Sequence, residues 1–466
     1  MLPSPTTMKP IAGAEPLSNN PSSTSSWFTP APGEARAAAV QLVDRATQSG
    51  AAHAEVFALR TYALRAEQSR GEVERQTDYR FTIRVWDANG ALGVASGQST
   101  APDSALRQSI VDEALANTAS GDTSTGLPPR LDIPDRGLDI NDRRLPQLDD
   151  DLRRGVLRSA VDGAIQVSRQ VSRAEFRYEE LHATRCFAST NGLGAEEHGT
   201  RFALIGGVSA EDHPIRVRGQ IVSRNFAEVA SRPLGHELGS RLVATLTPAD
   251  LPAQPTAVVF DQRAVAALLP RLLPAFSAER IAVGDSYLKG RVGSRMASRV
   301  LHIVDDARRP GGMASRGFDE RGVSPVAVNL IKEGRAAGLY QGPRAAQQVD
   351  ARPSGHERAD GSIWPGNLVV RPGSRSRNMV YPDLGTFVLV EEITDSGGVD
   401  PNTGTIDVGA LVFVADASGT HGCAGIRRLR CTADDLLSGI QRICNDQQRH
   451  GIVDTATWVV EGVWFE

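Results

Sequence analysis

Nine histidines and four cysteines are the side chains of this sequence best suited to binding a metal ion or to nucleophilic attack. No two histidines lie three to five residues apart, so a local metal-binding pattern of the His-x-x-x-His type is absent. His236 and His356 are each followed by a glutamate, as at the start of a metalloprotease motif, but no second histidine follows on the same helical face. We therefore expect both His-Glu pairs to be incidental.

The most suggestive local pair is His421 and Cys423, which a single glycine separates. An imidazole and a thiolate are both zinc ligands, but two ligands do not complete a site, and the others would have to come from distant parts of the sequence. The simpler interpretation is a glycine-rich turn with a buried thiol. The sequence also lacks a G-x-S-x-G nucleophile motif, a phosphate-binding loop and a dinucleotide-binding fingerprint, so spacing alone identifies no self-contained catalytic site.

The amino-acid composition of the chain excludes further classes of function. The chain has 466 residues, with 51 Lys and Arg against 55 Asp and Glu, and a formal net charge of −4 at pH 7. This balance excludes a generally basic nucleic-acid-binding protein and gives no reason to expect a membrane partner. The sequence contains no apolar run long enough to span a membrane, and the four cysteines form no C-x-x-C pair. Both features favour a soluble protein in the reducing cytoplasm.

Three regions differ in composition and periodicity. Residues 1–34 are rich in Ser, Pro, Thr and Asn, and we expect them to form a disordered tail. Residues 35–250 combine helical spacing of apolar residues with alternating, strand-like stretches. Within them, Asn89-Gly90 between two such stretches predicts a β-hairpin. Residues 251–466 contain short strands with glycine-rich turns, and we expect a second, β-rich domain there.

Helices and strands do not alternate as they do in parallel βαβ repeats. We therefore expect an α+β protein of two domains, with mainly antiparallel sheets and flanking helices. The helices that periodicity predicts in the first domain span 35–48, 103–119, 150–172 and 228–246. Those predicted in the second domain span 262–273 and 433–445.

A more specific pattern lies between Gly284 and Leu339. Its stretches are residues 286–293, 297–298, 303–306, 310–312, 318–322 and 330–334. In order and spacing they resemble the TldD/PmbA family, specifically its PmbA, or TldE, branch. Weaker matches extend the resemblance over about residues 36–466. The resemblance implies the two-domain TldD/PmbA-like architecture, with the family's C-terminal domain over residues 251–466.

The resemblance also implies a function. In this family a TldD-type subunit holds one zinc ion through an HExxxH helix and a distant cysteine. It pairs with a TldE-type subunit to form a peptidase that acts on unfolded peptides, including precursors of modified-peptide natural products. The corresponding window of this chain, residues 258–282, contains no histidine. Cys423 lies in the general region of the family's ligand cysteine, but one thiolate alone does not hold a catalytic ion.

We therefore expect the non-catalytic subunit of a heterodimeric zinc peptidase. It would have no cofactor of its own, and the zinc would lie in a TldD-like partner. Its second partner would be an extended peptide, and we expect neither nucleic acid nor a membrane to bind. The glycine pairs Gly311-Gly312 and Gly397-Gly398 are candidate peptide contacts, because glycine lets another backbone approach closely. An ordinary tight turn is the simpler interpretation of each pair.

Two alternatives remain open. One is a divergent stand-alone hydrolase, which would combine His421 and Cys423 with a carboxylate such as Asp306 or Glu320. The other is a peptide-binding scaffold that has no hydrolytic role.

Overall fold

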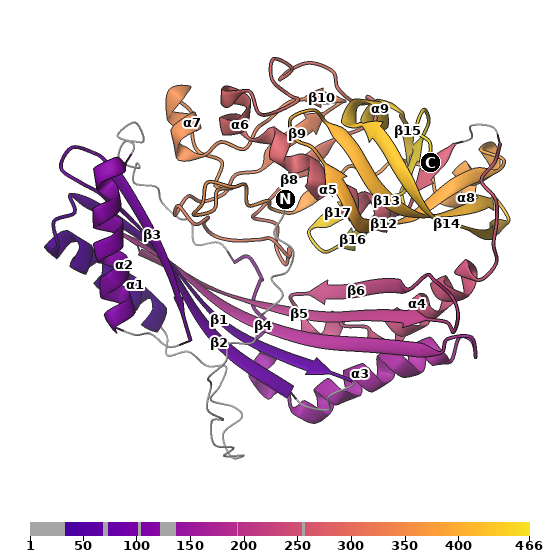
Figure 1. The fold of residues 1–466 in the computed structure, drawn as a ribbon, viewed down its shortest axis with the longest axis horizontal. Helices are drawn as coiled ribbons and strands as arrows, with labels where there is room; N and C mark the ends of the chain where they lie inside the picture. Colours follow the sequence, from indigo (N-terminus) through magenta and orange to yellow (C-terminus); the bar gives the residue numbers. More distant parts are fainter. Residues whose placement is uncertain (1–32, 69–72, 101–103, 122–136, 193, 254–256) are drawn as a thin grey trace.

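The fold is described by a computed structural model for residues 33–68, 73–100, 104–121, 137–192, 194–253 and 257–466 (Figure 1). Three six-stranded sheets with flanking helices make up this part of the chain, and most neighbouring strands are antiparallel. The expected α+β class is thus confirmed. Nearly all of the expected tail over residues 1–34 lies outside the described residues.

The first sheet has the strand order β3-β2-β1-β4-β5-β6, and every neighbouring pair is antiparallel. Its strands are β1 (His53–Glu67), β2 (Val73–Trp86), β3 (Leu92–Ser99), β4 (Arg173–Ser189), β5 (Gly194–Ser209) and β6 (Val217–Ser223). Its helices are α1 (Glu34–Gln48), α2 (Ser104–Asn117), α3 (Asp150–Ile165) and α4 (Ser231–Thr245). Three short 3-10 helices span Thr118–Ser120, Leu145–Gln147 and Phe226–Glu228. The predicted hairpin is present, with Gly90 at φ +82° between β2 and β3.

Side chains of the long strand β1 alternate between two environments. Val56 packs against α1, and Leu64, farther along, packs against α3. Phe57 lies on the opposite side, next to its register partner Phe187 of β4. Because successive side chains of a strand point to opposite faces, the helices cover one face of the sheet. The other face, on which Phe57 and Phe187 lie, is called the inner face, and it curves beneath the second half of the chain (Figure 1).

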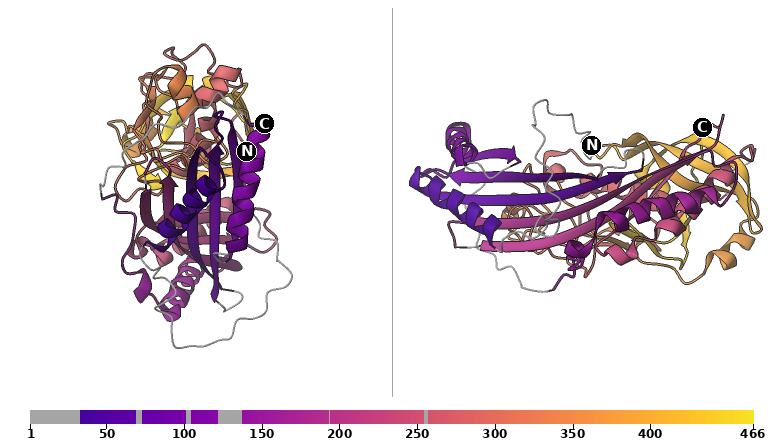
Figure 2. Two further views of the ribbon diagram at one scale, coloured as in Figure 1. Left: turned by 90° about the vertical axis from the view of Figure 1, so that its left-hand side faces the viewer. Right: turned by 90° about the horizontal axis from the view of Figure 1, so that it is seen from below.

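Helix α4 lies close against α3, and two glycines make this possible. A Cβ atom on Gly235 would lie 1.9 Å from the carbonyl oxygen of Ala160, and one on Gly163 would lie 2.3 Å from that of Arg232. No other residue fits at such a distance. This close packing holds α4 beside the edge strand β6, where it reaches the second half of the chain. The views in Figure 2 show that the long strands extend beyond that half on the side where α1 and α2 lie.

The second half contains the other two sheets. Their strand orders are β14-β13-β12-β7-β18-β15 and β10-β9-β8-β11-β17-β16, with parallel pairs at β12–β7 and β11–β17. The strands are β7 (Val258–Phe260), β8 (Ile303–Asp305), β9 (Val328–Lys332), β10 (Arg335–Ala336), β11 (Leu368–Val370), β12 (Phe387–Val399), β13 (Thr405–Asp416), β14 (Gly419–Thr432), β15 (Ile440–Ile443), β16 (Gln448–His450), β17 (Val453–Thr455) and β18 (Trp458–Val460). The helices are α5 (Gln262–Leu272), α6 (Ala278–Val283), α7 (Pro343–Gln348), α8 (Arg377–Val380) and α9 (Ala433–Ser438), with 3-10 turns over Leu273–Phe276 and Tyr381–Asp383.

One prediction for this half is wrong in part. The helix expected over 433–445 ends at Ser438, and the rest of the stretch enters strand β15. Ile440 and Ile443 are buried there and pair with β18, so tertiary burial of two β-branched residues replaces the last turns of the helix. Within the described part of the chain, we find no helix long and apolar enough to cross a membrane.

Candidate functional site at the domain joints

Two groups of contacts join the halves of the chain, and both place charged side chains at the boundary. The first, called the loop joint, consists of residues 305–324 and 354–367 packed against the inner face. Phe318 of this loop is buried between Phe57 and Phe187. Gly322 follows at φ +72°, where a Cβ atom would lie 2.4 Å from the Phe187 ring. The stretch 318–322, part of the series that carries the family resemblance, therefore anchors the second half on the first sheet.

Two arginines of strand β2 hold the same loop through polar contacts. Arg84 is fully buried and donates hydrogen bonds to the carbonyl oxygens of Glu320 and Ala359, at 3.4 and 2.7 Å. Arg80 forms an ion pair of 2.6 Å with the Glu320 carboxylate. Burial lowers the pKa of Arg84 to about 10, so the guanidinium remains charged at neutral pH. The buried charge is stabilised by backbone dipoles from the other half of the chain.

A third arginine, half-buried just beyond strand β6, acts in the same way. Arg224 donates to the carbonyl oxygens of Gly312 and Met313, at 3.3 and 2.7 Å, and to that of Thr200 at 2.8 Å. Burial lowers its pKa to about 10. The structure thus places the Gly311-Gly312 turn inside the loop joint, directly under Arg224.

The glycines of this turn are needed for packing. The amide of Gly311 donates to the carbonyl oxygen of Leu138, and its φ is +65°. A Cβ atom on Gly312 would lie 2.5 Å from the side chain of Asn367. Asn367 in turn donates to Ser315 Oγ at 2.9 Å and accepts from the amide of Ala314. The pair Gly311-Gly312, which the sequence suggested as a peptide contact, therefore lies at a closely packed boundary between the two halves of the chain.

A buried polar network lies within the loop joint and links it to Tyr340. Asp305 accepts hydrogen bonds from the hydroxyl of Tyr340 at 2.6 Å and from the amide of Gly366 at 2.8 Å. His356 Nε2 lies 3.4 Å from the other carboxylate oxygen. Burial acts to raise the pKa of Asp305, but His356 and Tyr340 outweigh it and hold this pKa below its usual value. The hydrogen bonds from Tyr340 and Gly366, with His356 close by, thus hold Asp305 in place.

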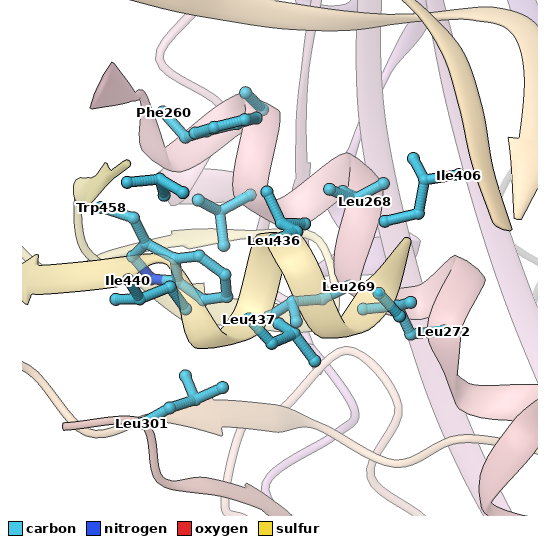
Figure 3. Packing of buried hydrophobic residues seen from close by; sticks show 14 of the residues in the cluster. Phe260, Leu268, Leu269, Leu272, Leu301, Ile406, Leu436, Leu437, Ile440 and Trp458 are labelled. Atoms are coloured by element: carbon cyan, nitrogen blue, oxygen red, sulfur yellow. The ribbon is translucent and has the colours of Figure 1, made fainter. Parts of the chain in front are cut away.

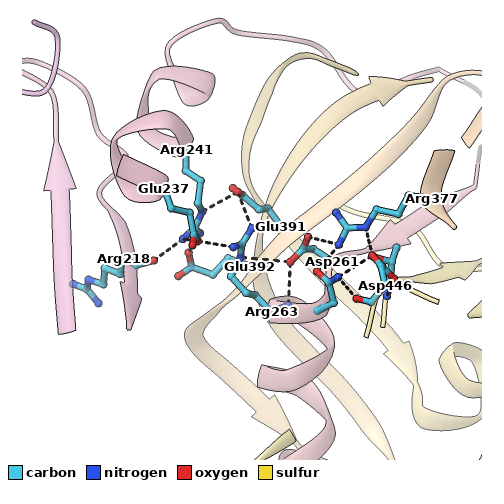
Figure 4. A network of polar contacts seen from close by, with 11 residues as sticks. Arg218, Glu237, Arg241, Asp261, Arg263, Arg377, Glu391, Glu392 and Asp446 are labelled. Atoms are coloured by element: carbon cyan, nitrogen blue, oxygen red, sulfur yellow. Dashed lines mark hydrogen bonds and ion pairs between the residues drawn. The ribbon is translucent and has the colours of Figure 1, made fainter. Parts of the chain in front are cut away.

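The second group of contacts, called the helix joint, links α4 to β12 and α5 (Figure 4). Arg241 of α4 is buried and contacts the carboxylates of Glu391 and Glu392, each at 2.8 Å. Arg263 of α5 reaches back to Glu237 of α4 at 2.5 Å. Burial raises the pKa of Glu391 even though Arg241 opposes the shift. His236-Glu237, which resembles half of a metalloprotease motif, therefore supplies an ion-pair carboxylate here.

Helix α5 occupies the window in which the resemblance places the zinc-binding helix of a TldD-type subunit. It begins after Asp261, whose side chain accepts from the amide of Arg263 and caps the helix. Its apolar face carries Leu268, Leu269 and Leu272, which are buried in the main core beside Trp458 (Figure 3). In this window the chain therefore has a helix that packs into the core, and not a row of polar side chains that could bind a metal ion.

His421 and Cys423 are not brought together by strand β14. The imidazole of His421 is half exposed and pairs with Asp416 at 2.7 Å, across the turn between β13 and β14. Cys423 is buried against Leu411 and Phe413, and burial raises the pKa of its thiol. Its backbone bonds to residues 247 and 249, which connect the two halves. The thiol therefore lies in an apolar boundary, which suits packing rather than nucleophilic attack.

Gly397 and Gly398 lie in strand β12, opposite β13, beside a shift in register. Gly397 has φ +83°, and a Cβ atom there would lie 1.9 Å from the carbonyl oxygen of Asp407. Gly398 has open space around its Cα atom. The first glycine is thus required by the bulge, while the second is compatible with the approach of another chain.

The carboxylates of the hydrolase alternative have other partners. Glu320 contacts Arg80 and the amide of Ala359, and Asp306 accepts from the amide of Arg308. The residues that the structure describes include no group of three or more His, Cys, Asp or Glu side chains placed to hold a metal ion.

Sequence reasoning missed the joint residues Arg84, Arg224 and Arg241. Their partners are backbone carbonyls and carboxylates distant in sequence, which no local spacing reveals. Even Arg84 gives no signal, because it falls on the polar side of the alternation in strand β2, where an exposed side chain is expected.

Comparison with known proteins is consistent with this architecture. Residues 253–465 match the family described as PmbA/TldA metallopeptidase C-terminal domain. Metalloprotease PmbA of Escherichia coli O157:H7 is 22% identical over 377 residues, which are 77% of this chain and 80% of that protein. A metalloprotease of Methanothermobacter thermautotrophicus is 26% identical over 263 residues, 54% of this chain and 56% of that protein.

The fold also matches a solved structure. The crystal structure of TldE from Thermococcus kodakarensis superposes with a TM-score of 0.78, at 17% identity, and the match covers 92% of this chain and 99% of that one. The expected α+β architecture of mainly antiparallel sheets is therefore the architecture of a known fold.

Proposed function

Because this chain is a member of the TldD/PmbA family, we propose that it is the non-catalytic, TldE-like subunit of a heterodimeric zinc peptidase. Its partner is a TldD-like subunit, which holds the zinc ion and carries out hydrolysis. The substrates are extended, unfolded peptides, including precursors of modified-peptide natural products. The complex acts in the cytoplasm, and the four free thiols of this chain suit that reducing compartment.

The observation that carries this proposal is the nature of helix α5. A catalytic zinc site needs three protein ligands, an open position for water and a general base. In the window 258–282 this chain instead places Leu268, Leu269 and Leu272 in its core. Replacing these side chains by ligands would remove core packing. The helix therefore supports the second half structurally, and the chemistry falls to the partner.

The joints suggest what this subunit contributes. Two sets of arginines fix the second half of the chain against the first sheet, at Arg84 and Arg224 on one side and at Arg241 on the other. A subunit held in one shape can form a wall of a peptide chamber without the cost of ordering itself on binding. The proposed role is to close such a chamber around the partner's zinc site.

Reconstitution tests the proposal directly. This chain, a TldD-like subunit from the same organism and the co-purified pair are each incubated with an unstructured fluorogenic peptide. Only the pair should cleave the peptide, and a zinc chelator should abolish the cleavage. A matched control is the pair in which the first histidine of the partner's HExxxH motif is replaced by alanine. That pair should still form but should be inactive.

Two results would contradict the proposal. The first is cleavage by this chain alone, which would support a stand-alone hydrolase. The second is a partner whose rate is the same with and without this chain, since an accessory subunit must change the rate of the reaction.

A further inference from the structure

A cavity lies at the end of the inner face that is farthest from the loop joint. It has a volume of about 520 Å³ and is formed by the ends of β1, β4, β5 and β6. This volume falls within the range of small-ligand pockets, and it has room for a few residues of an extended peptide. The charged residues of its lining are Glu67, Arg173, Glu175, Arg177, Arg216 and Arg218. We call it the arginine pocket.

The charges of the arginine pocket do not balance. Four arginines face two glutamates in the lining, and a third carboxylate just outside it, that of Glu179, pairs with Arg177 at 2.8 Å. Glu175 is shared by Arg216, at 2.5 Å, and Arg173. Its carboxylate accepts from Arg216, and this contact holds the pKa of Glu175 below its usual value. Because one carboxylate serves two guanidinium groups, a positive excess remains at a cavity in a chain whose net charge is −4.

The backbone of strand β5 makes room for one of these arginines. Gly207 lies on the inner face, and a Cβ atom there would lie 2.6 Å from Nε of Arg216. The absence of a side chain at residue 207 therefore lets the Arg216 guanidinium lie across β5 at the cavity. Ile205 and Phe176 add apolar surface to the lining. The pocket thus combines a positioned cation with an apolar floor, as ligand sites commonly do.

The spacing of the arginines indicates the shape of the ligand. Arg216 and Arg218 are two residues apart along an extended segment, so both side chains project from the same side. Alternate side chains of an extended peptide have the same repeat, about 6.6 Å at 3.3 Å per residue. The geometry points to the arginine pocket as a binding site for an extended peptide that carries carboxylates at alternate positions.

A peptide fits this pocket better than a nucleic acid does. Nucleic-acid sites extend along wide basic surfaces, whereas this cavity is small and partly apolar. The inference deepens the proposed function by naming an acidic stretch as a preferred substrate feature, and it rests on that function for the identity of the ligand as a peptide.

Equilibrium binding to the isolated full chain tests the site without the partner or its zinc. The probe is a labelled eight-residue peptide with glutamate at every second position, and the control probe has glutamine at those positions; binding is followed by fluorescence anisotropy. The glutamate peptide should bind at least about tenfold more tightly. The double variant Arg216→Gln/Arg218→Gln should lose about tenfold or more in affinity for the glutamate peptide and little for the glutamine peptide.

A matched control variant is Arg428→Gln/Arg430→Gln. These two arginines are also two residues apart on a strand and share one carboxylate, that of Asp407, but they are not part of the pocket lining. The control should bind the glutamate peptide as the parent chain does. Thermal unfolding of both variants checks that each remains folded.

Three results would overturn the inference. They are equal binding of the two peptides, an equal loss in the two double variants, and displacement of the peptide by a single-stranded oligonucleotide of the same charge at lower concentration. The last result would assign the pocket to nucleic acid. None of these results depends on hydrolysis, so the site can fail while the accessory-subunit proposal stands, and the reverse is also true.

Discussion

Single guanidinium groups hold much of the boundary between the two halves. Arg84 and Arg224 donate across this boundary to backbone carbonyl oxygens, and the fully buried Arg316 donates to carbonyl oxygens within the loop joint itself. Burial lowers the pKa of each to about 10, which leaves all three charged at neutral pH. The guanidinium group is planar and has five N–H donors, so it can satisfy several carbonyl oxygens at once. A lysine ammonium group has a different geometry and cannot replace it in this arrangement. The shape of the guanidinium group therefore matters as well as its charge, for Arg84 and Arg224 across the boundary and for Arg316 within the loop joint.

Gly322 is the position in the loop joint that should tolerate substitution least. Gly322→Ala introduces a Cβ atom against the Phe187 ring at a residue with φ +72°. We expect the free energy of unfolding to fall by about 2–4 kcal/mol. The control is Gly361→Ala, with φ +78° and open space around the Cα atom, which should cost only about 1 kcal/mol. Denaturant unfolding measures both, and equal losses would contradict the packing role of Gly322.

His182 should make stability depend on pH. It is buried beside His198, with ring centroids 5.9 Å apart, and burial lowers its pKa to about 4. In the unfolded chain the imidazole binds a proton below about pH 6.5, while in the folded chain it does so only near pH 4. The contribution of His182 to the free energy of unfolding is therefore fully present above pH 6.5, and it is lost as the pH falls toward 4.

The expected loss is up to roughly 3 kcal/mol, and it should be absent in His182→Gln. Unfolding free energies of the parent and the variant are compared between pH 7 and pH 4, with His236→Gln as a control that removes an exposed imidazole. A parent and a His182→Gln variant with parallel pH profiles would refute the assignment.

Cys423 separates the accessory-subunit account from the stand-alone hydrolase. Its thiol is buried against Leu411 and Phe413, so Cys423→Ser should lower the free energy of unfolding by about 1–2 kcal/mol. The cleavage rate of the folded, reconstituted pair should stay the same, because the thiol has no catalytic part in our account. Loss of the rate in a variant that remains folded would favour the hydrolase instead.

At the scale of elements, the sequence predicts what depends on local pattern and misses what depends on distant partners. The alternation of β2 and the Asn89-Gly90 turn predict their hairpin, and spacing predicts α5 nearly to its ends. The stretch 433–445 has helical spacing, yet Ile440 and Ile443 pair with β18 instead. The site shows the same division, because His421 and Cys423 are neighbours in sequence but face different surroundings.

Helix α5 should behave as a core element. Leu269→Ala removes a buried side chain next to the other leucines of this helix, and we expect a loss of about 2–5 kcal/mol in the free energy of unfolding. Leu152→Ala on α3 is the matched control, since that leucine is 49% exposed and should cost little. Equal and small effects would mean that α5 does not support the core.

At the scale of the whole molecule, the two joints lie near opposite ends of β6. Arg224 follows the end of this strand, and Arg241 donates to the carbonyl oxygen of Arg218 near its start. The second half of the chain is therefore held to the first sheet at two separated places. This arrangement suits a subunit that gives a fixed shape to a shared chamber and leaves metal chemistry to a partner.

Native mass spectrometry of this chain co-expressed with a TldD-like subunit tests that central claim most directly. One spectrum reports the masses of the free chains, of the complexes and of any bound zinc. We predict a complex with one copy of each chain and a single zinc ion, beside a metal-free form of this chain. A homo-oligomer that ignores the partner, or a free chain that carries its own zinc, would contradict the account.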